Sequence, residues 1–350
     1  MKVCIYKGFE TLVEKSGVGS AMRHQERILQ DAGCEVLQHM DAETEVVHLN
    51  TVFPDSVIEA LLAKLCGKTV IYYGHSTMED FRNSFKGSNL LAPVFRTWIK
   101  LCYNMGDVIL TPTEYSRSLL TSYGIRKPIV ALSNGIDIGQ FAPNREKRRI
   151  FRQKYHLSEE DKVILSVGHY IERKGILEFI EMARSMPEVQ FLWFGYTNPK
   201  LIPAKVQKAM EDAPANVQFP GYVTPEELRY AYQGSDLFCF MSHEETEGIV
   251  VLEALACKIP VLVRDIPVYA DWLEDGVNVY KAAETEEFIC TAEKLLNGSL
   301  PDLSEQGWAV AKERAFPAIA DKMKWIYQRY RRERSTWLWK GGTVRENTNR

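Results

Sequence analysis

Short runs of β-branched and aromatic residues alternate with amphipathic segments along the whole chain. In the first half, the runs that predict strands are Lys2–Tyr6, Val46–Asn50, Thr69–Gly74, Val108–Thr111 and Ile129–Ser133. In the second half, they are Val163–Val167, Val189–Phe194, Val217–Phe219, Leu237–Met241 and Pro260–Val263. The helices expected between them are Ser20–Ala32, Ser56–Leu65, Glu114–Ser122, Gly175–Ser185, Thr224–Gln233 and Gly248–Ala256. Because the strands are almost continuously apolar, we expect parallel sheets with helices on both faces.

This alternation occurs twice, and 350 residues exceed the usual size of one domain. The pattern therefore predicts an α/β protein with two Rossmann-like, parallel-sheet domains that face each other across a cleft. We expect the first domain to cover residues 1–143 and the second to cover residues 144–318. Residues 319–340 are expected to form a helix that returns toward the first domain, and the polar residues 341–350 a disordered tail.

Composition narrows the class of protein. A hydrophobic content of 45% and a charged content of 25% are typical of a globular protein, and a net charge of −3 argues against a nucleic-acid partner. The seven cysteines are scattered without a Cys-x-x-Cys pair, which fits a reducing cytoplasm. We see no signal peptide and no apolar run of about 18 residues, so we expect a cytoplasmic protein that does not span a membrane.

The most informative segment for function begins at Glu245. Glu245 and Glu253 lie eight residues apart around Gly248, between a predicted strand and the predicted helix 248–256. Ligands of α/β proteins bind beyond the carboxyl ends of strands, and a helix N-terminus favours phosphate. Carboxylates accept hydrogen bonds from sugar hydroxyls, so the segment suits a nucleotide-sugar. Two ordinary acids on an amphipathic helix are the alternative. The backbone positions expected at the phosphate are Gly248, Ile249 and Val250.

Other residues follow predicted strands and point to the same cleft. Arg173 and Lys174 come after the strand ending at Val167, where they could neutralise a diphosphate, or could simply be solvated. Gly17 and Gly19 follow the first strand, in a turn that allows close approach of a ligand to the backbone. His75 follows the strand ending at Gly74 and is either a ligand of the sugar or a loop histidine bonded to backbone.

The segment 245–261 resembles the E-x7-E signature of retaining glycosyltransferases of family 4, which have the GT-B fold. The resemblance implies that Glu245 contacts the donor sugar, that Glu253 contacts the nucleotide ribose and that His75 touches sugar hydroxyls. The family has a basic pair and then a glycine where this chain has Lys174 and Gly175, but its usual arginine is replaced by His169, so Arg173 or His169 takes that role. The same resemblance extends to three further segments, namely Gly17–Gly19, Asn134–Asp137 at the domain junction, and the loop with Gly221 and Tyr222 beside the base.

The resemblance also bears on cofactors and mechanism. The chain has no Asp-x-Asp motif and no His/Cys cluster at metal-ligand spacing. Members of the family generally work without a bound metal, so we expect no metal and no cofactor. No side chain stands out as a nucleophile. The family resemblance implies front-face attack assisted by the leaving phosphate, with Glu245, Lys174 and His75 as the candidate catalytic residues.

Residues 81–103 combine aromatic and basic side chains and contain no acid. This composition suits an anionic membrane surface, and residues 322–340 are similar. An amphipathic helix with its aromatic residues in the core is the alternative. The candidate membrane contacts are Arg82, Lys86, Arg96, Trp98 and Lys100.

Gly17–Ala21 and His75–Phe85 are more specifically similar to glycolipid synthases of Gram-positive bacteria, whose diglycosyl lipid can anchor lipoteichoic acid. We therefore expect a hexosyltransferase that moves galactose or glucose from UDP-galactose or UDP-glucose to glucosyl-diacylglycerol, at the inner face of the cell membrane. One alternative is a family 4 enzyme with a soluble or polyprenyl-linked acceptor in polysaccharide synthesis. Another is a nucleotide-sugar epimerase or a non-catalytic binding protein of the same fold.

Overall fold

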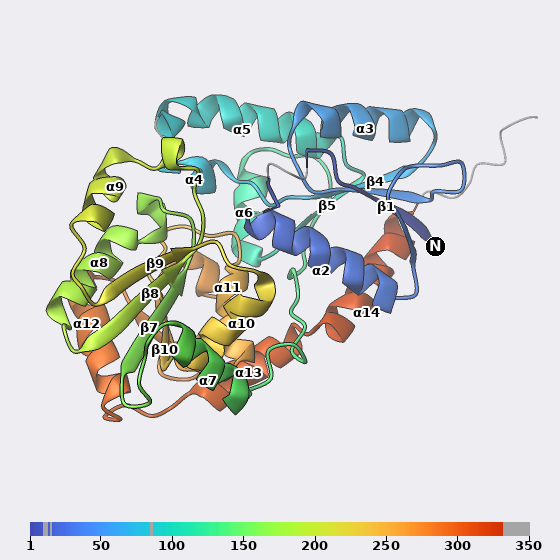
Figure 1. The fold of residues 1–350 in the computed structure, drawn as a ribbon. Coiled ribbons are helices and arrows are strands. Elements are labelled where there is room, and N and C mark those ends of the chain that lie inside the picture. The colour runs from blue at the N-terminus through green and yellow to red at the C-terminus, as the bar shows by residue number, and fades with distance from the viewer. Residues whose placement is uncertain (10–12, 15, 85–86, 332–350) are drawn as a thin grey trace, which may run out of the picture.

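The computed structural model describes residues 1–9, 13–14, 16–84 and 87–331. It contains two six-stranded sheets, and all neighbouring strands in both are parallel (Figure 1). The first sheet has the order β2-β1-β3-β4-β5-β6, and the second has the order β12-β11-β10-β7-β8-β9. Lys15, Lys86 and the predicted segments beyond residue 331 lie outside the described residues.

The first half of the chain builds the first sheet and its helices. Its strands are β1 Lys2–Tyr6, β2 Glu35–Leu37, β3 Val46–Leu49, β4 Thr69–Tyr73, β5 Val108–Thr111 and β6 Ile129–Ala131. Its helices are α2 Gly17–Asp31, α3 Pro54–Leu65, α4 Met78–Phe81, α5 Ser88–Asn104 and α6 Glu114–Ser122. Strands β3, β4 and β5 are buried at every position, as expected for a sheet covered on both faces.

The second half builds the second sheet. Its strands are β7 Lys162–Val167, β8 Val189–Phe194, β9 Val217–Gly221, β10 Leu237–Phe240, β11 Val261–Arg264 and β12 Tyr280–Ala282. Its α-helices are α7 Arg145–Lys154, α8 Ile176–Ser185, α9 Ala204–Glu211, α10 Pro225–Gly234, α11 Ile249–Ala256, α12 Thr285–Leu296, α13 Ser304–Glu313 and α14 Phe316–Tyr330. Short 3₁₀ turns are η1 Glu172–Lys174, η2 Pro199–Leu201 and η3 Pro267–Tyr269. Helix α10 starts with a capping box formed by Thr224 and Glu227.

The chain passes between the halves twice, and the two crossings lie side by side. The backbone N–H of Ile136 donates to Arg314, and that of Phe316 donates to Ile136. After the second crossing, α14 packs beside α2 and buries Phe316 and Tyr327 against the first sheet (Figure 1). Phe141 already packs in the core of the second half, together with Ile136.

Both sheets have a point where the strand order reverses. In the second sheet it lies between β7 and β10, which are hydrogen-bonded neighbours although they are far apart in sequence. The loops that leave β7 and β10 therefore diverge and leave a crevice at the carboxyl ends of these strands. The segments after these two strands contain Lys174 and Glu245, so strand order alone brings the two predicted residues together.

Candidate active site

A cavity of about 620 Å³ lies between the two halves. The first half contributes Gly17 at the start of α2 and His75 after β4. The second half contributes Lys174, Glu245 and Glu253. The three candidate catalytic residues and the second glutamate of the motif thus line one cavity, at a size that accommodates a small ligand.

Lys174 and Glu245 form a buried ion pair in the part of the cavity wall that the second half contributes. Their side chains are 13% and 9% exposed, and the ammonium group donates to Glu245 Oε1. Burial raises the pKa of the Glu245 carboxyl, but the charges of Lys174 and Arg173 outweigh burial and hold its pKa below the ordinary value. The cavity therefore contains an ionised acceptor for hydroxyl groups beside a fixed cation.

Two glycines allow this arrangement of the backbone. Gly175 has a φ of +79°, and a Cβ atom there would lie 2.3 Å from the carbonyl oxygen of Met241. Gly248 has a φ of +87° and caps α11 without a side chain. Gly248, Ile249 and Val250 line the cavity, so the N-terminus of α11, with its first N–H groups unpaired within the helix, lies at the cavity wall.

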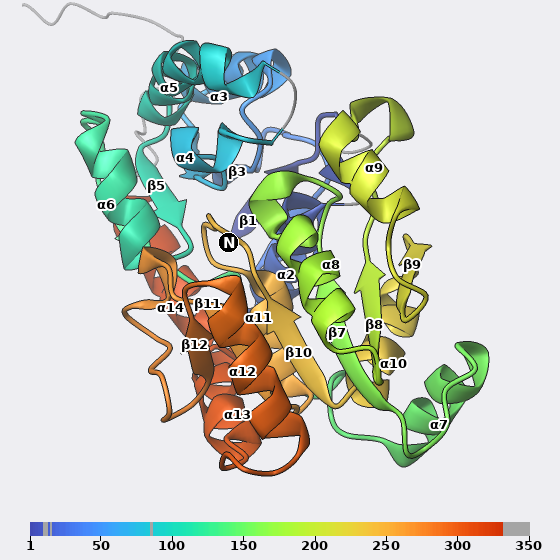
Figure 2. The ribbon, with the colours of Figure 1, turned by 90° about the vertical axis from the view of Figure 1, so that its left-hand side faces the viewer.

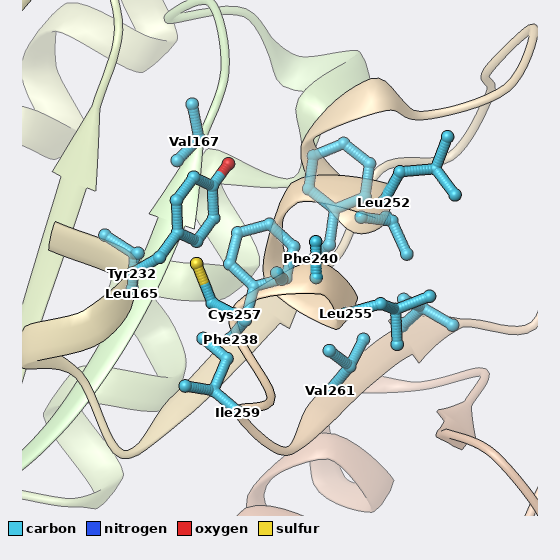
Figure 3. Close-up of a cluster of buried hydrophobic side chains, with 14 of the residues drawn as sticks. Leu165, Val167, Tyr232, Phe238, Phe240, Leu252, Leu255, Cys257, Ile259 and Val261 are labelled. Carbon is cyan, nitrogen blue, oxygen red and sulfur yellow. The ribbon is translucent and has the colours of Figure 1, made fainter. Parts of the chain in front are cut away.

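Glu253 lies on the second turn of α11 and faces the same cavity. Leu252 and Leu255 on either side of it belong to the buried cluster that packs α11 onto β10 (Figure 3). The hydroxyl of Tyr232 donates to Glu253 Oε2 at 2.7 Å. Burial raises the pKa of the Glu253 carboxyl to about 7, although Tyr232, Arg229 and Arg23 act in the opposite direction.

His75 is buried in the wall that the first half contributes. Its ring stacks on Tyr73 with 4.5 Å between the ring centroids, and its Nε2 lies 2.9 Å from Asn50 Oδ1 and 3.4 Å from Gln25 Nε2. Burial lowers the pKa of His75 to about 3. The ring is therefore neutral and interacts through hydrogen bonds, not as a cation. Asn50 and Gln25 were not among the predicted site residues; the local signal for Asn50 is its position directly after β3.

Arg173 lines the cavity, but its guanidinium group is already engaged. Nη1 lies 2.8 Å from Asp80 Oδ1 and donates to the carbonyl oxygen of Glu244 at 2.6 Å, while Nε donates to Ser84 at 3.2 Å. His169, the other candidate for this role, bonds through Nδ1 to the Tyr196 carbonyl oxygen, and burial lowers its pKa. Lys174 also lines the cavity, where its ammonium group is paired with Glu245.

The remaining predicted donor residues divide into two groups. Tyr222 lines the cavity with 44% of its surface exposed. Gly221 is not among the lining residues, and its carbonyl oxygen accepts a bond from Gly195 N. Gly19 is also outside the lining. It packs against backbone instead, since a Cβ there would lie 2.6 Å from the carbonyl oxygens of Val13 and Glu14. Gly19 thus allows close packing of backbone, whereas Gly17 faces the ligand space.

Four of the predicted membrane contacts are described: Arg82 directly follows α4, and Arg96, Trp98 and Lys100 lie on α5. These four residues do not line the cavity. Arg82, Arg96 and Lys100 are exposed. Trp98 differs from the prediction, because its ring packs against the core and its Nε1 donates to the carbonyl oxygen of Val52 at 2.6 Å.

Helices α3 and α5 cover the same face of the first sheet (Figures 1 and 2). The two helices expose large apolar side chains to solvent, of which Leu90 and Leu65 are 85% and 75% exposed. We call this surface the α3–α5 face. Its exposed apolar residues are Ile58, Leu61, Leu62, Leu65, Leu90, Leu91, Val94 and Leu101.

Two searches of the described residues bear on membranes and metals. No helix among them is long and apolar enough to cross a bilayer. Their His, Cys, Asp and Glu side chains do not gather in threes in a way that could hold a metal ion.

The sequence of this chain is similar to those of known proteins. Residues 147–310 match the family described as glycosyl transferases group 1, and residues 25–140 match glycosyltransferase family 4. The processive diacylglycerol alpha-glucosyltransferase of Acholeplasma laidlawii is 39% identical over 94% of this chain and 98% of that protein. The alpha-galactosylglucosyldiacylglycerol synthase of Streptococcus pneumoniae is 25% identical over 86% of this chain and 82% of that protein.

Solved structures agree on the architecture. Anabaena HepE, in complex with UDP and glucose, aligns with a TM-score of 0.74 at 16% identity, over 94% of this chain and all (100%) of that chain. The sucrose-phosphate synthase of Thermosynechococcus elongatus aligns with a TM-score of 0.77 at 14% identity, over 94% and 98% of the two chains. These likenesses confirm the predicted GT-B fold.

The fold and the relatives together define a glycosyltransferase. The chain belongs to the group 1 and family 4 glycosyltransferases, and the family predicted from the E-x7-E segment is thereby confirmed. The more specific resemblance is also confirmed, because both curated relatives named above are diacylglycerol glycolipid enzymes by name.

Proposed function

We propose that this enzyme transfers glucose from UDP-glucose to a glucosyl-diacylglycerol at the inner face of the cell membrane, with retention of the anomeric configuration. The observation that carries the proposal is the meeting of Lys174, Glu245, Glu253 and the N-terminus of α11 in one cavity. This set matches the parts of a nucleotide-sugar: a diphosphate, a sugar and a ribose. UDP-galactose is the alternative donor.

The proposed chemistry uses the charges of the protein. The bond from the anomeric carbon to the diphosphate oxygen breaks, and the acceptor oxygen attacks from the same face of the sugar. The acceptor proton passes to the oxygen of the leaving UDP. Lys174 and the first N–H groups of α11 stabilise the negative charge that develops there, and Glu245 and neutral His75 hold the sugar hydroxyls. In this proposal no metal is required, because these groups supply the positive potential.

The names of the relatives support the sugar and its stereochemistry. The relative at 39% identity is named an alpha-glucosyltransferase, and the one at 25% identity is named an alpha-galactosylglucosyl lipid synthase. UDP-hexoses carry an α-linked sugar, so an α-linked product requires retention.

The α3–α5 face supports a lipid-borne acceptor. Exposed leucines favour insertion at a bilayer surface, and Arg82, Arg96 and Lys100 beside them favour anionic headgroups. The face belongs to the half that carries His75, opposite the half with the donor residues, so a lipid head group could enter the cavity while the donor site stays in water.

The proposal is tested by incubating the enzyme with labelled UDP-glucose or UDP-galactose and one of three acceptors: glucosyl-diacylglycerol, diacylglycerol or a soluble alkyl glucoside. We expect a diglucosyl lipid with an α linkage, identified by chromatography and α-glucosidase digestion. A product formed only on the soluble acceptor would instead support the polysaccharide alternative.

A further inference from the structure

The loop that carries Glu245, residues 242–248, is bonded to the opposite half of the protein. The hydroxyl of Tyr115 donates to both carboxylate oxygens of Glu244, at 2.9 and 3.1 Å. The hydroxyls of Thr113 and Ser116 reach the carbonyl oxygen of Thr246 at 2.9 and 3.0 Å. We call residues 242–248 the donor loop.

The same pattern continues at the next position of the donor loop. The backbone N–H and the side-chain amide of Asn134 donate to Glu247 Oε2, at 3.1 and 2.6 Å. Glu244, Thr246 and Glu247 are thus held by the first half, whereas Glu245 between them turns into the cavity toward Lys174.

The hydroxyl contacts come from one rigid element. Thr113 is the N-cap of α6, and Tyr115 and Ser116 lie in its first turn. Thr113 is 8% exposed and Ser116 is fully buried, so these groups are fixed by the packing of α6. Helix α6 therefore holds the backbone after Glu245, at the Thr246 carbonyl oxygen, and the side chain before it, at the Glu244 carboxylate.

We propose that Tyr115, Thr113 and Ser116 are positioning residues, which hold the donor loop from across the interface and thereby keep Glu245 in place for the donor. This inference rests on the proposed function insofar as Glu245 binds the donor sugar. It adds that the half without donor-binding carboxylates controls the affinity for the donor.

Other contacts at this interface act in the same direction. Arg173 bridges Asp80 of α4 and the carbonyl oxygen of Glu244, which ties the first half to the donor loop at a second place. The Glu244 carboxyl is partly buried, and burial together with nearby Asp80, Glu79 and Glu245 raises its pKa to about 7. Loss of the Tyr115 hydroxyl would leave this carboxyl without its hydrogen-bond donor from α6, and opening would relieve that cost.

The test compares Tyr115→Phe with Tyr230→Phe in the intact enzyme. Tyr230 also donates its hydroxyl to a carboxylate, that of Glu226 at 3.1 Å, but within one helix of the second half. We expect Tyr115→Phe to raise the apparent KM for UDP-glucose about tenfold, the scale of one hydrogen bond to a charged group. Turnover at saturating donor stays near that of wild type, because bound donor closes the halves again. Tyr230→Phe leaves both constants unchanged.

Further variants separate positioning from a general loss of structure. Thr113→Val with Ser116→Ala should raise the donor KM in the same way. Glu244→Gln keeps an oxygen that accepts the Tyr115 bond, so its KM should lie closer to wild type than that of Glu244→Ala. A fall in turnover with an unchanged KM would indicate damaged folding and would overturn the proposal.

Two measurements judge the proposal even if the enzyme proves to use another acceptor or sugar. Small-angle scattering should show a larger radius of gyration for the triple variant of Tyr115, Thr113 and Ser116 than for wild type, and saturating UDP should remove the difference. Calorimetry should show weaker binding of UDP by the same variant. Equal radii together with equal UDP affinities would refute the positioning role, whereas failure of wild type to form glycolipid would refute only the proposed function.

Discussion

At the scale of single residues, the site depends on buried groups whose charge state is set by their neighbours. Glu245 stays ionised because Lys174 and Arg173 outweigh the effect of its burial, whereas Glu253 has only the more distant Arg229 and Arg23 and its pKa rises to about 7. Two glutamates of one motif are therefore expected to respond differently to pH.

The first prediction concerns Glu253 and pH. Because its pKa is raised to about 7, the carboxyl is protonated as pH falls through that value and loses an acceptor for the ribose hydroxyls. We expect the KM for UDP-glucose to be constant above about pH 8 and to rise up to tenfold per pH unit below about pH 7. The Tyr232 hydroxyl stays protonated over this range, because burial raises its pKa well above the ordinary value.

Steady-state kinetics of wild type and Glu253→Gln decide this prediction. Glu253→Gln should have a high KM for UDP-glucose, and residue 253 should no longer make that KM depend on pH. Glu244 also has a raised pKa of about 7. If the KM of Glu253→Gln still depends on pH, the double variant Glu253→Gln/Glu244→Gln shows whether Glu244 is the cause. A wild-type KM that is flat between about pH 6 and about pH 8 would contradict the account.

The second prediction concerns Lys174. We expect Lys174→Ala to lower turnover by roughly 10²-fold or more, the scale of one lost partner of transition-state charge. The substitution also leaves the Glu245 carboxylate buried without its cation, so Lys174→Ala/Glu245→Ala is measured alongside to separate the two effects. EDTA should leave wild-type activity unchanged. Activity that is lost with EDTA and restored by magnesium would contradict the metal-free mechanism.

At the scale of elements, the sequence predicted the strands and helices that hold the site and the edge strands β6 and β9, but it missed the edge strands β2 and β12. β10, the donor loop and α11 follow the expected boundaries within a residue or two, because Gly248 and the apolar run after it carry a strong local signal. Strands β2 and β12 have three residues each, and their sequences, Glu-Val-Leu and Tyr-Lys-Ala, lack the continuous apolar run that marks the equally short β6. Helix α3 was predicted as a helix, but the exposure of its leucines was not predicted. Periodicity alone does not show whether leucines point to a core or to solvent.

The third prediction concerns the α3–α5 face. Neutralising Arg82, Lys86, Arg96 and Lys100 should weaken binding to anionic vesicles by up to about 1 kcal/mol per charge, and salt should do the same. Leu65→Ser with Leu90→Ser should also weaken binding, but without dependence on salt, because the lost contribution is apolar.

Vesicle sedimentation with a matched control tests this prediction. The control neutralises four exposed cations of the second half, namely Arg145, Lys162, Lys294 and Lys312. It should pellet like wild type. Equal pelleting of wild type, the charge variant and the leucine variant would mean that the α3–α5 face is only a solvated surface.

At the scale of the whole molecule, the cavity lies between the two halves, and both halves contribute lining residues from segments that follow strands of their sheets. The sequence was sufficient to predict two such sheets and to assign Glu245, Glu253 and Lys174 to one cleft. It did not indicate Tyr115, Asn50 or Glu244, because their partners lie in other elements and a single sequence carries no signal for such pairs. Arg173 shows the same limit, since Asp80 and Ser84, which it contacts, are about 90 residues away.

The central claim is that the interdomain cavity transfers a hexose with Glu245 holding the donor sugar. The most direct test is transfer of labelled glucose from UDP-glucose to glucosyl-diacylglycerol by wild type and by Glu245→Ala, with folding checked by circular dichroism and thermal unfolding. The account predicts diglucosyl lipid from wild type and loss of at least about 10²-fold in turnover from a variant that remains folded. Near-normal transfer by Glu245→Ala would contradict it.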